Sequence, residues 1–148
     1  MGKQIRIGVI ILAVLVVAYV GMDMWGLYQN EQLWGYRPVI LFIAIWKAIQ
    51  LSLTLRWKEM MPRWRWLTMS TVSGVLLALA FPPFPTTFLI FIAWVPLLLV
   101  EHEVSGTKNS GRKVMFFAYN AFVIWNILAT YWVGNTAFVA GVFAMFLN

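Results

Sequence analysis

The chain alternates long apolar runs with short polar segments, and these runs set its predicted architecture. Five of them predict membrane-spanning helices, at about residues 7–24, 38–55, 67–81, 88–100 and 114–132. A final apolar run, 137–147, is too short to cross a bilayer, which needs roughly 20 residues. We therefore expect an all-α, polytopic transmembrane helix bundle of about five spans plus the start of a sixth, with the chain cut inside that sixth span.

Composition agrees with a membrane protein. Hydrophobic residues make up 62% of the 148 residues and charged residues 11%, whereas soluble globular domains have roughly 45–50% and 25%. The net charge of +6 reflects basic residues beside the apolar runs, so we interpret it as membrane topology and expect no nucleic-acid partner. The chain has no cysteine, which excludes disulfides, thiolate metal sites and a cysteine nucleophile within it.

Basic residues also predict the orientation of the spans. Lys and Arg concentrate on the cytoplasmic side of membrane proteins, while Trp and Tyr gather at the membrane–water interface. The segment 23–36 has this aromatic character, and two later segments are basic. The parts predicted to be cytoplasmic are the N-terminus, 56–65 and 101–113, and those predicted to lie outside are 23–37 and 82–87.

A stretch of small residues followed by prolines organises the middle of the chain. Ser70, Gly74 and Ala78 recur at helical spacing, and such a stripe lets another helix approach closely inside a bilayer. The helix then meets a proline-rich turn that includes Phe81, Pro82, Pro83 and Phe84, where the prolines remove backbone donors and end the helix. This turn is either a plain connection or part of the floor beneath a catalytic domain.

Two charged features allow a functional and a structural interpretation. Lys47 lies within a predicted span, where an ionisable residue is by default a functional candidate; the alternative is a lysine that extends its stem to the interface. Glu101, His102 and Glu103 are adjacent, but neighbouring residues on a regular element do not converge on one ion. We expect a solvated charged loop there, and no metal site or cofactor.

Polar and aromatic residues of the fifth predicted span fall on two neighbouring faces. Tyr119, Asn126 and Thr130 share one face by their spacing, and Trp125 and Trp132 lie seven residues apart on the next. Polar groups in a bilayer pair across helices, so helix packing is one interpretation and the lining of a lipid or substrate cavity is the other. Trp132 also fits an interface anchor.

Several short apolar motifs resemble a known family. They are LALAFPPF at 77–84, WVPLLL at 94–99, FVIWNIL at 122–128 and YWV at 131–133. These motifs, in this order, are similar to the first membrane hairpin and the following span of apolipoprotein N-acyltransferases, in particular the version of Bacteroidetes-type bacteria. The resemblance covers about 67–148, which we interpret as a partial acyltransferase-type membrane domain, truncated at its C-terminus. Residues 1–66 are then an N-terminal extension of two spans.

The resemblance implies a multi-pass enzyme of the bacterial inner membrane, with its N-terminus in the cytoplasm. Family members transfer an acyl chain from a phospholipid to the amino group of a lipoprotein's N-terminal cysteine. They use a nitrilase-like periplasmic domain whose triad is Glu, Lys and Cys. This chain lacks that domain and any cysteine, so we expect it to be inactive alone and to meet the apolipoprotein only through the missing domain.

Two other functions remain open from the residues. A non-catalytic, multi-pass interaction or scaffold protein would keep the membrane fold without the chemistry. A small transporter half would use Lys47 as its coupling group and predicts a second, similar half or a dimer. The sequence has no internal repeat that would supply such a half.

Overall fold

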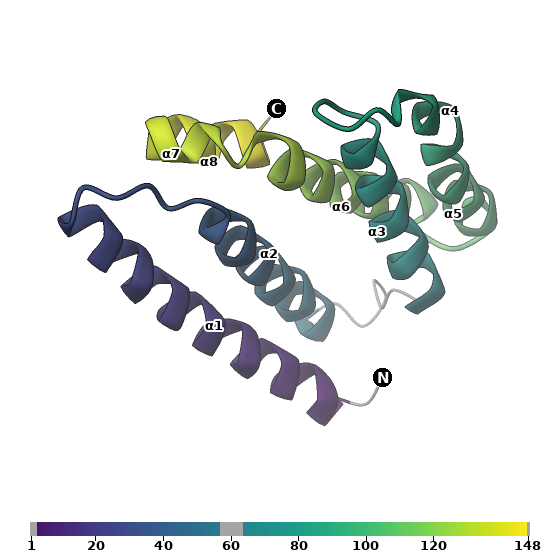
Figure 1. Cartoon of the computed structure of the whole chain (residues 1–148). Helices are drawn as coiled ribbons and strands as arrows, with labels where there is room; N and C mark the ends of the chain where they lie inside the picture. The colour runs from purple at the N-terminus through teal and green to yellow at the C-terminus, as the bar shows by residue number, and fades with distance from the viewer. Residues whose placement is uncertain (1–2, 57–63, 148) are drawn as a thin grey trace. The chain divides into compact units, whose positions relative to one another are not determined.

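The computed structural model describes residues 3–56 and 64–147, and every regular element in these two ranges is helical. The expected all-α class is thus confirmed (Figure 1). The elements in order are α1 (Lys3–Gln29), α2 (Arg37–Arg56), α3 (Trp64–Leu79), the 3₁₀ helix η2 (Thr87–Leu89), α4 (Ile90–Ala93), α5 (Val95–Ser105), α6 (Ser110–Thr130), α7 (Val133–Thr136) and α8 (Phe138–Phe146).

The chain divides into two compact units. The N-terminal unit groups residues 1–61 with 130–148, and the central unit spans 62–129. The central unit therefore interrupts the N-terminal unit in sequence. The predicted boundary between an extension at 1–66 and a membrane domain at 67–148 stays a prediction. The two parts of the N-terminal unit nevertheless show that the end of the chain packs with its beginning.

Three helical stretches of the described residues are long and apolar enough to cross a membrane: Gln4–Gln29, Thr87–Ser105 and Ser110–Thr130. The sequence predicts five spans plus part of a sixth. By the length and hydropathy of the described helices, that count was too high. α3 has 16 residues and α8 has 9, which is short of the roughly 20 that a bilayer requires. α2 carries Lys47 and Gln50 near its middle.

Prolines separate the helices of the central unit. The segment 80–86 follows α3 as a turn that contains Pro82, Pro83 and Pro85, none of which has an N–H to continue a helix. The Thr86 hydroxyl donates to the Leu79 carbonyl at 2.5 Å and so satisfies one of the carbonyls that a helix leaves free at its end. Pro96 then stands in the first turn of α5, just after the break from α4.

The N-terminal unit is built on the antiparallel pair α1 and α2, which lie side by side (Figure 1). Its apolar core contains Val20, Met24 and Leu41, with Trp34 and Ile45 packed against them. The short helices α7 and α8 belong to the same unit. They approach so closely that a Cβ on Gly141 would lie 2.6 Å from the Gly134 Cα, so only glycine fits at this position.

The basic segment predicted to be cytoplasmic at 56–65 falls mostly outside the described residues, because Lys58 and Arg63 lie in the range 57–63. The second basic segment, 101–113, is described. Its first part is not a loop, since α5 continues to Ser105 and includes Glu101, His102 and Glu103. The helix extends because these residues follow Val100 without a proline or glycine until Gly106.

Candidate functional site

Within the central unit, α3 meets α6 at the small residues of α3. Ser70, Gly74 and Ala78 are all buried. A Cβ built on Gly74 would lie 2.4 Å from the Ala121 carbonyl oxygen and 2.9 Å from the Ile124 Cβ. The two backbones are therefore closer than any larger residue at position 74 would permit.

A buried polar cluster of Ser70, Ser73 and Asn120, with the half-buried Thr71 at its edge, lies beside this contact. The Ser70 hydroxyl donates to the Phe117 carbonyl at 2.5 Å and accepts from the Asn120 amide at 2.8 Å. The Asn120 amide also reaches the Thr71 hydroxyl at 3.3 Å. Ser73 donates to the Ala93 carbonyl. Because these bonds connect α3 to α4 and α6 away from water, they fix how the helices pack.

Sequence reasoning overlooked Asn120, which is fully buried. A signal for it exists, because Asn120 shares the buried face of α6 with Phe117, Ala121 and Ile124 at spacings of three and four residues. The hydrogen bonds of the cluster also exclude its serines as activated nucleophiles. The Ser70 and Ser73 hydroxyls both donate to backbone carbonyls, and the chain's single histidine, His102, is exposed on α5. These contacts serve packing and do not form a nucleophile–base pair.

Glu103 joins α5 to the start of α3. Its carboxylate accepts from the Trp66 indole at 2.7 Å and pairs with the Arg65 guanidinium at 2.7 Å. The Trp66 ring packs edge-on against Phe117, with ring centroids 5.9 Å apart. The expectation of a solvated charged loop misses this contact. Among the described residues, no group of three His, Asp or Glu side chains could hold a metal ion.

The residues that the sequence placed on two faces of the fifth span differ in how far they are buried. Asn126 is buried, Thr130 is half-buried, and Tyr119 is 40% exposed. On the neighbouring face, Trp132 is exposed, while Trp125 is half-buried and its indole nitrogen has no hydrogen-bond partner among the described residues. Whether these residues contact lipid or substrate stays a prediction.

The proline turn and Lys47 lie apart from the buried polar cluster in sequence. Phe81, Pro82, Pro83 and Phe84 are all exposed and form a turn. Lys47 is half-buried in α2 and donates to the Gln50 side-chain oxygen at 3.0 Å, while Gln50 itself is fully buried. Lys47 is thus hydrogen-bonded within its own helix.

The N-terminal unit contains an aromatic pocket that the sequence did not predict. Its volume is about 560 Å³, and it is lined by Gly21, Met24, Trp25, Tyr28, Trp34, Leu41 and Phe138. The lining comes from α1, from the α1–α2 connection, from α2 and from α8. The Trp34 ring packs edge-on against Phe138, with centroids 5.7 Å apart, and Phe42 contacts both Phe138 and Phe146.

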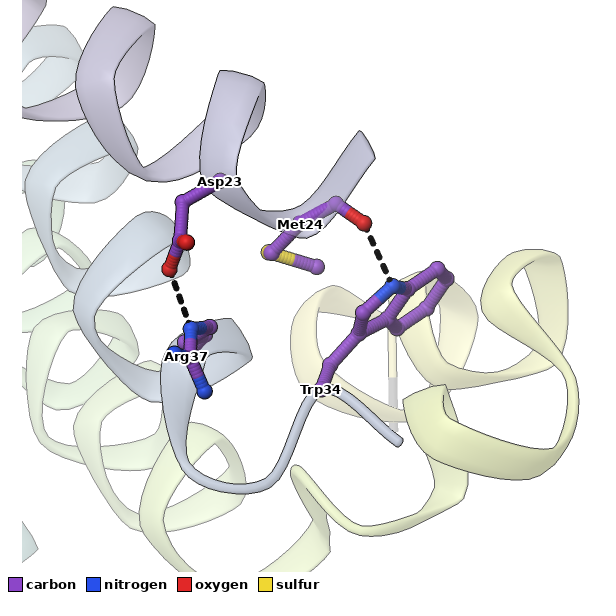
Figure 2. Close-up of polar contacts among 4 residues, drawn as sticks. All are labelled: Asp23, Met24, Trp34 and Arg37. Atoms are coloured by element: carbon purple, nitrogen blue, oxygen red, sulfur yellow. Dashed lines mark hydrogen bonds and ion pairs between the residues drawn. The ribbon is translucent and has the colours of Figure 1, made fainter. Parts of the chain in front are cut away.

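Polar contacts hold the mouth of the α1–α2 hairpin beside this pocket. Figure 2 shows the Trp34 indole donating to the Met24 carbonyl at 2.9 Å, and Arg37 paired with Asp23. The hydrogen bond to Asp23 raises the pKa of Arg37 above its ordinary value. These contacts set the position of Trp34 and so help to shape the pocket.

A second pocket, whose lining is more polar than that of the first, adjoins it. It has a volume of about 570 Å³ and shares Tyr28, Trp34 and Phe138 with the aromatic pocket. Its other lining residues are Gln29, Glu31, Gln32, Leu33, Gly134, Asn135 and Thr136. The Asn135 amide donates to the Gly35 carbonyl at 3.2 Å, which ties α7 to the α1–α2 connection. The side-chain oxygen of Asn135 has no hydrogen-bond partner among the described residues.

Comparison with known families agrees with the resemblance of the apolar motifs. The family model of the apolipoprotein N-acyltransferase N-terminal domain matches residues 73–147, which is just over half of the chain. The match covers most of the central unit and extends through α7 and α8. Comparisons with curated proteins and with solved structures gave no match. The chain belongs to the family of the apolipoprotein N-acyltransferase N-terminal domain.

Proposed function

We propose that this chain forms the N-terminal, membrane-embedded part of an apolipoprotein N-acyltransferase. The observation that carries the proposal is the family match over residues 73–147. Three apolar helical stretches long enough to cross a membrane support a role within the bilayer. The reaction would move a fatty acyl chain from a phospholipid to the amino group of an apolipoprotein's N-terminal cysteine.

The chemistry would come from a nitrilase-like domain with a Glu, Lys and Cys triad, as the family resemblance implies. An acyl transfer of this kind needs an activated nucleophile and a base to prepare it. This chain has no cysteine, and the hydroxyls of Ser70 and Ser73 are engaged by backbone carbonyls. We infer that the chain alone does not catalyse the reaction. Its closely packed α3 and α6 would act as a rigid membrane base for the catalytic domain.

Reconstitution tests the inactivity of the isolated chain. The purified chain is incorporated into phospholipid vesicles with a diacylated lipoprotein peptide, and mass spectrometry measures the triacylated product. We expect no product above a protein-free control. A triacylated peptide, in a preparation free of the complete enzyme, would mean that the catalytic machinery lies in this chain.

A chimaera tests the family role directly. Residues 73–147 would replace the matched segment of an active family member, and the same peptide assay would measure transfer. We expect activity with the native segment and its loss with Gly74→Ile, because that substitution separates α3 from α6. A native chimaera that inserts in the membrane and remains inactive would count against the proposal.

We further propose that the chain resides in the bacterial inner membrane with its N-terminus in the cytoplasm. The basic residues at Lys108, Arg112 and Lys113 favour a cytoplasmic position for the connection between α5 and α6. A cysteine introduced at Ser110 should stay unlabelled by an impermeant thiol reagent in intact spheroplasts and react after lysis. Labelling before lysis would reverse the orientation.

A non-catalytic scaffold is the second candidate. It is favoured by the N-terminal unit, because α1 and α2 lie outside the family match and supply part of the lining of the aromatic pocket. The coding DNA after Asn148 separates the two functions. An open frame that continues into further spans and a nitrilase-like insert supports the enzyme, whereas a stop codon supports the scaffold.

A further inference from the structure

We propose that residues 87–93 form a strap that can lift away from α3, and that the Ser73 hydroxyl is the latch that holds this strap closed. The strap consists of η2 and α4, and it joins the proline turn to α5. The strap, α3 and α5 all belong to the central unit. The device does not depend on the acyl-transfer function proposed for the chain.

The strap is much less buried than the helix that follows it. All of the strap is described, and Ala93 is its only buried residue, whereas Phe91 on α4 is 83% exposed. In contrast, α5 places Val100 and Val104 in an apolar cluster with Phe117. Segments with few buried contacts open at a lower free energy than the rest of a domain. We therefore expect the strap to open while α5 stays in place.

The end of the strap at α5 contains a hinge. Pro96 has no N–H to donate to the Ile92 carbonyl, and α4 ends at Ala93 while α5 begins at Val95. Trp94, between the two helices, keeps helical backbone angles of φ −78° and ψ −23°. The described state is therefore the closed one, and the chain can bend at the proline, where helices commonly kink.

The latch is a hydrogen bond from outside the broken helix. Ser73 is fully buried on α3, and its hydroxyl donates to the Ala93 carbonyl in the strap. Serine side chains of neighbouring helices commonly satisfy backbone groups near a proline break inside a membrane. Because the donor belongs to α3, the bond exists only while the strap lies against α3. Ser73 thus stabilises the closed state relative to the open state.

Separate contacts hold the two ends of the strap. Before it, the Thr86 hydroxyl donates to the Leu79 carbonyl of α3 at 2.5 Å. After it, the Trp94 ring packs edge-on against Phe122 of α6, with ring centroids 6.0 Å apart. These contacts do not involve Ser73, so they remain when the latch is broken. The expected movement is therefore a lift of the middle of the strap, with its ends held.

The reactivity of single introduced cysteines measures the opening, because the chain has no cysteine of its own. Ala93→Cys places a thiol at the buried position of the strap, and Val100→Cys places one at a buried position of α5. Each purified full chain in detergent is treated with N-ethylmaleimide, and mass spectrometry follows the rate of modification. A buried thiol reacts only when its segment opens, so the rate reports the open fraction.

Matched variants test the latch and the hinge. Ser73→Ala should raise the rate at position 93 about threefold, and at most about twentyfold, as expected from a hydrogen bond between membrane helices. The rate at position 100 should not change. Ser70→Ala is the control and should leave position 93 unchanged, because this buried serine of α3 donates to α6. Pro96→Ala restores an N–H at the hinge and should slow the reaction at position 93.

Three results would contradict the proposal. Equal rates at position 93 with and without Ser73→Ala would remove the latch. Equal acceleration at positions 93 and 100 would mean that the whole of α5 separates from α3. An unchanged rate in Pro96→Ala would exclude the hinge. If Ser73→Ala does not fold, as judged by its melting temperature and helical content, the rate in Pro96→Ala decides alone.

A distance measurement covers the case in which Ala93→Cys does not fold. Nitroxide labels are attached at Phe91→Cys on the strap and Met115→Cys on α6, because both native residues are exposed. Pulsed electron paramagnetic resonance then gives the distribution of distances between the labels. We expect Ser73→Ala to broaden this distribution and to leave that of Leu98→Cys with Met115→Cys unchanged. A distribution for position 91 that Ser73→Ala does not alter would overturn the proposal.

Discussion

The two units of this protein hold their helices together by different means. In the central unit, α3 contacts α6 through a glycine and through buried hydrogen bonds that involve Ser70 and Asn120. In the N-terminal unit, aromatic rings such as Trp34, Phe42 and Phe138 pack together. An ion pair and a hydrogen bond from the Trp34 indole to a backbone carbonyl hold the hairpin mouth.

This difference follows from where polar groups can be placed. A hydrogen bond between buried groups has no competing water and defines one helix arrangement. A partly exposed ion pair is screened by solvent and salt and contributes little. Single substitutions in the central unit should therefore lower the free energy of unfolding strongly. In the N-terminal unit, large losses are expected mainly where two backbones are in contact.

The largest effect is expected for Gly74→Ile. Its Cβ would lie 2.4 Å from the Ala121 carbonyl oxygen, so α3 and α6 must separate, at a cost of about 3 kcal/mol or more in the free energy of unfolding. Thermal unfolding in detergent measures this. Val75→Ile is the control, since Val75 is exposed, and equal melting temperatures for the two variants would show that α3 does not depend on the contact at Gly74.

The next effect is expected for Gly141→Ala in the N-terminal unit. The new methyl group would lie 2.6 Å from the Gly134 Cα, which is backbone and cannot rotate away. We expect a loss of about 1–3 kcal/mol. Gly26→Ala is the control, because its Cβ meets nothing within 4 Å and alanine favours the helix by up to about 1 kcal/mol. If Gly141→Ala melts at the same temperature as this control, the close contact between α7 and α8 does not contribute to stability.

A double-mutant cycle of Ser70→Ala and Asn120→Ala measures the buried bond directly. The two side chains are 2.8 Å apart, and we expect a coupling of about 0.6 kcal/mol, with about 1.7 kcal/mol as the upper end for membrane helices. Unfolding free energies of the four proteins give this value. Additive losses would mean that the bond contributes nothing to stability.

The smallest effect is expected for Asp23→Asn. The change removes the ion pair with Arg37, whose side chains are 42% and 32% exposed for Asp23 and Arg37 respectively. We expect a loss below about 1 kcal/mol that shrinks further in high salt. Unfolding at low and high ionic strength measures both. A loss as large as that of Gly74→Ile would mean that the hairpin mouth, and not the aromatic packing, holds the N-terminal unit.

The sequence by itself determined the elements that depend on nearby residues. Apolar composition and periodicity predict an all-α membrane protein, and the prolines after Leu79 predict where α3 ends. The motifs from Leu77 to Val133 predict the family, which the match at 73–147 confirms. The helices and the proline turn depend on residue types within one or two turns of the chain, whereas the family depends on the order of short motifs along it.

Tertiary structure decided the features that join residues far apart in sequence. Asn120 contacts Ser70 across 50 positions, Glu103 contacts Trp66 across 37, and Asn135 contacts Gly35 across 100. A hydrophobic pattern reports which face of a helix is apolar but not which helix covers it. The aromatic pocket depends on such pairings, because Phe138 on α8 completes a wall that begins at Gly21 on α1.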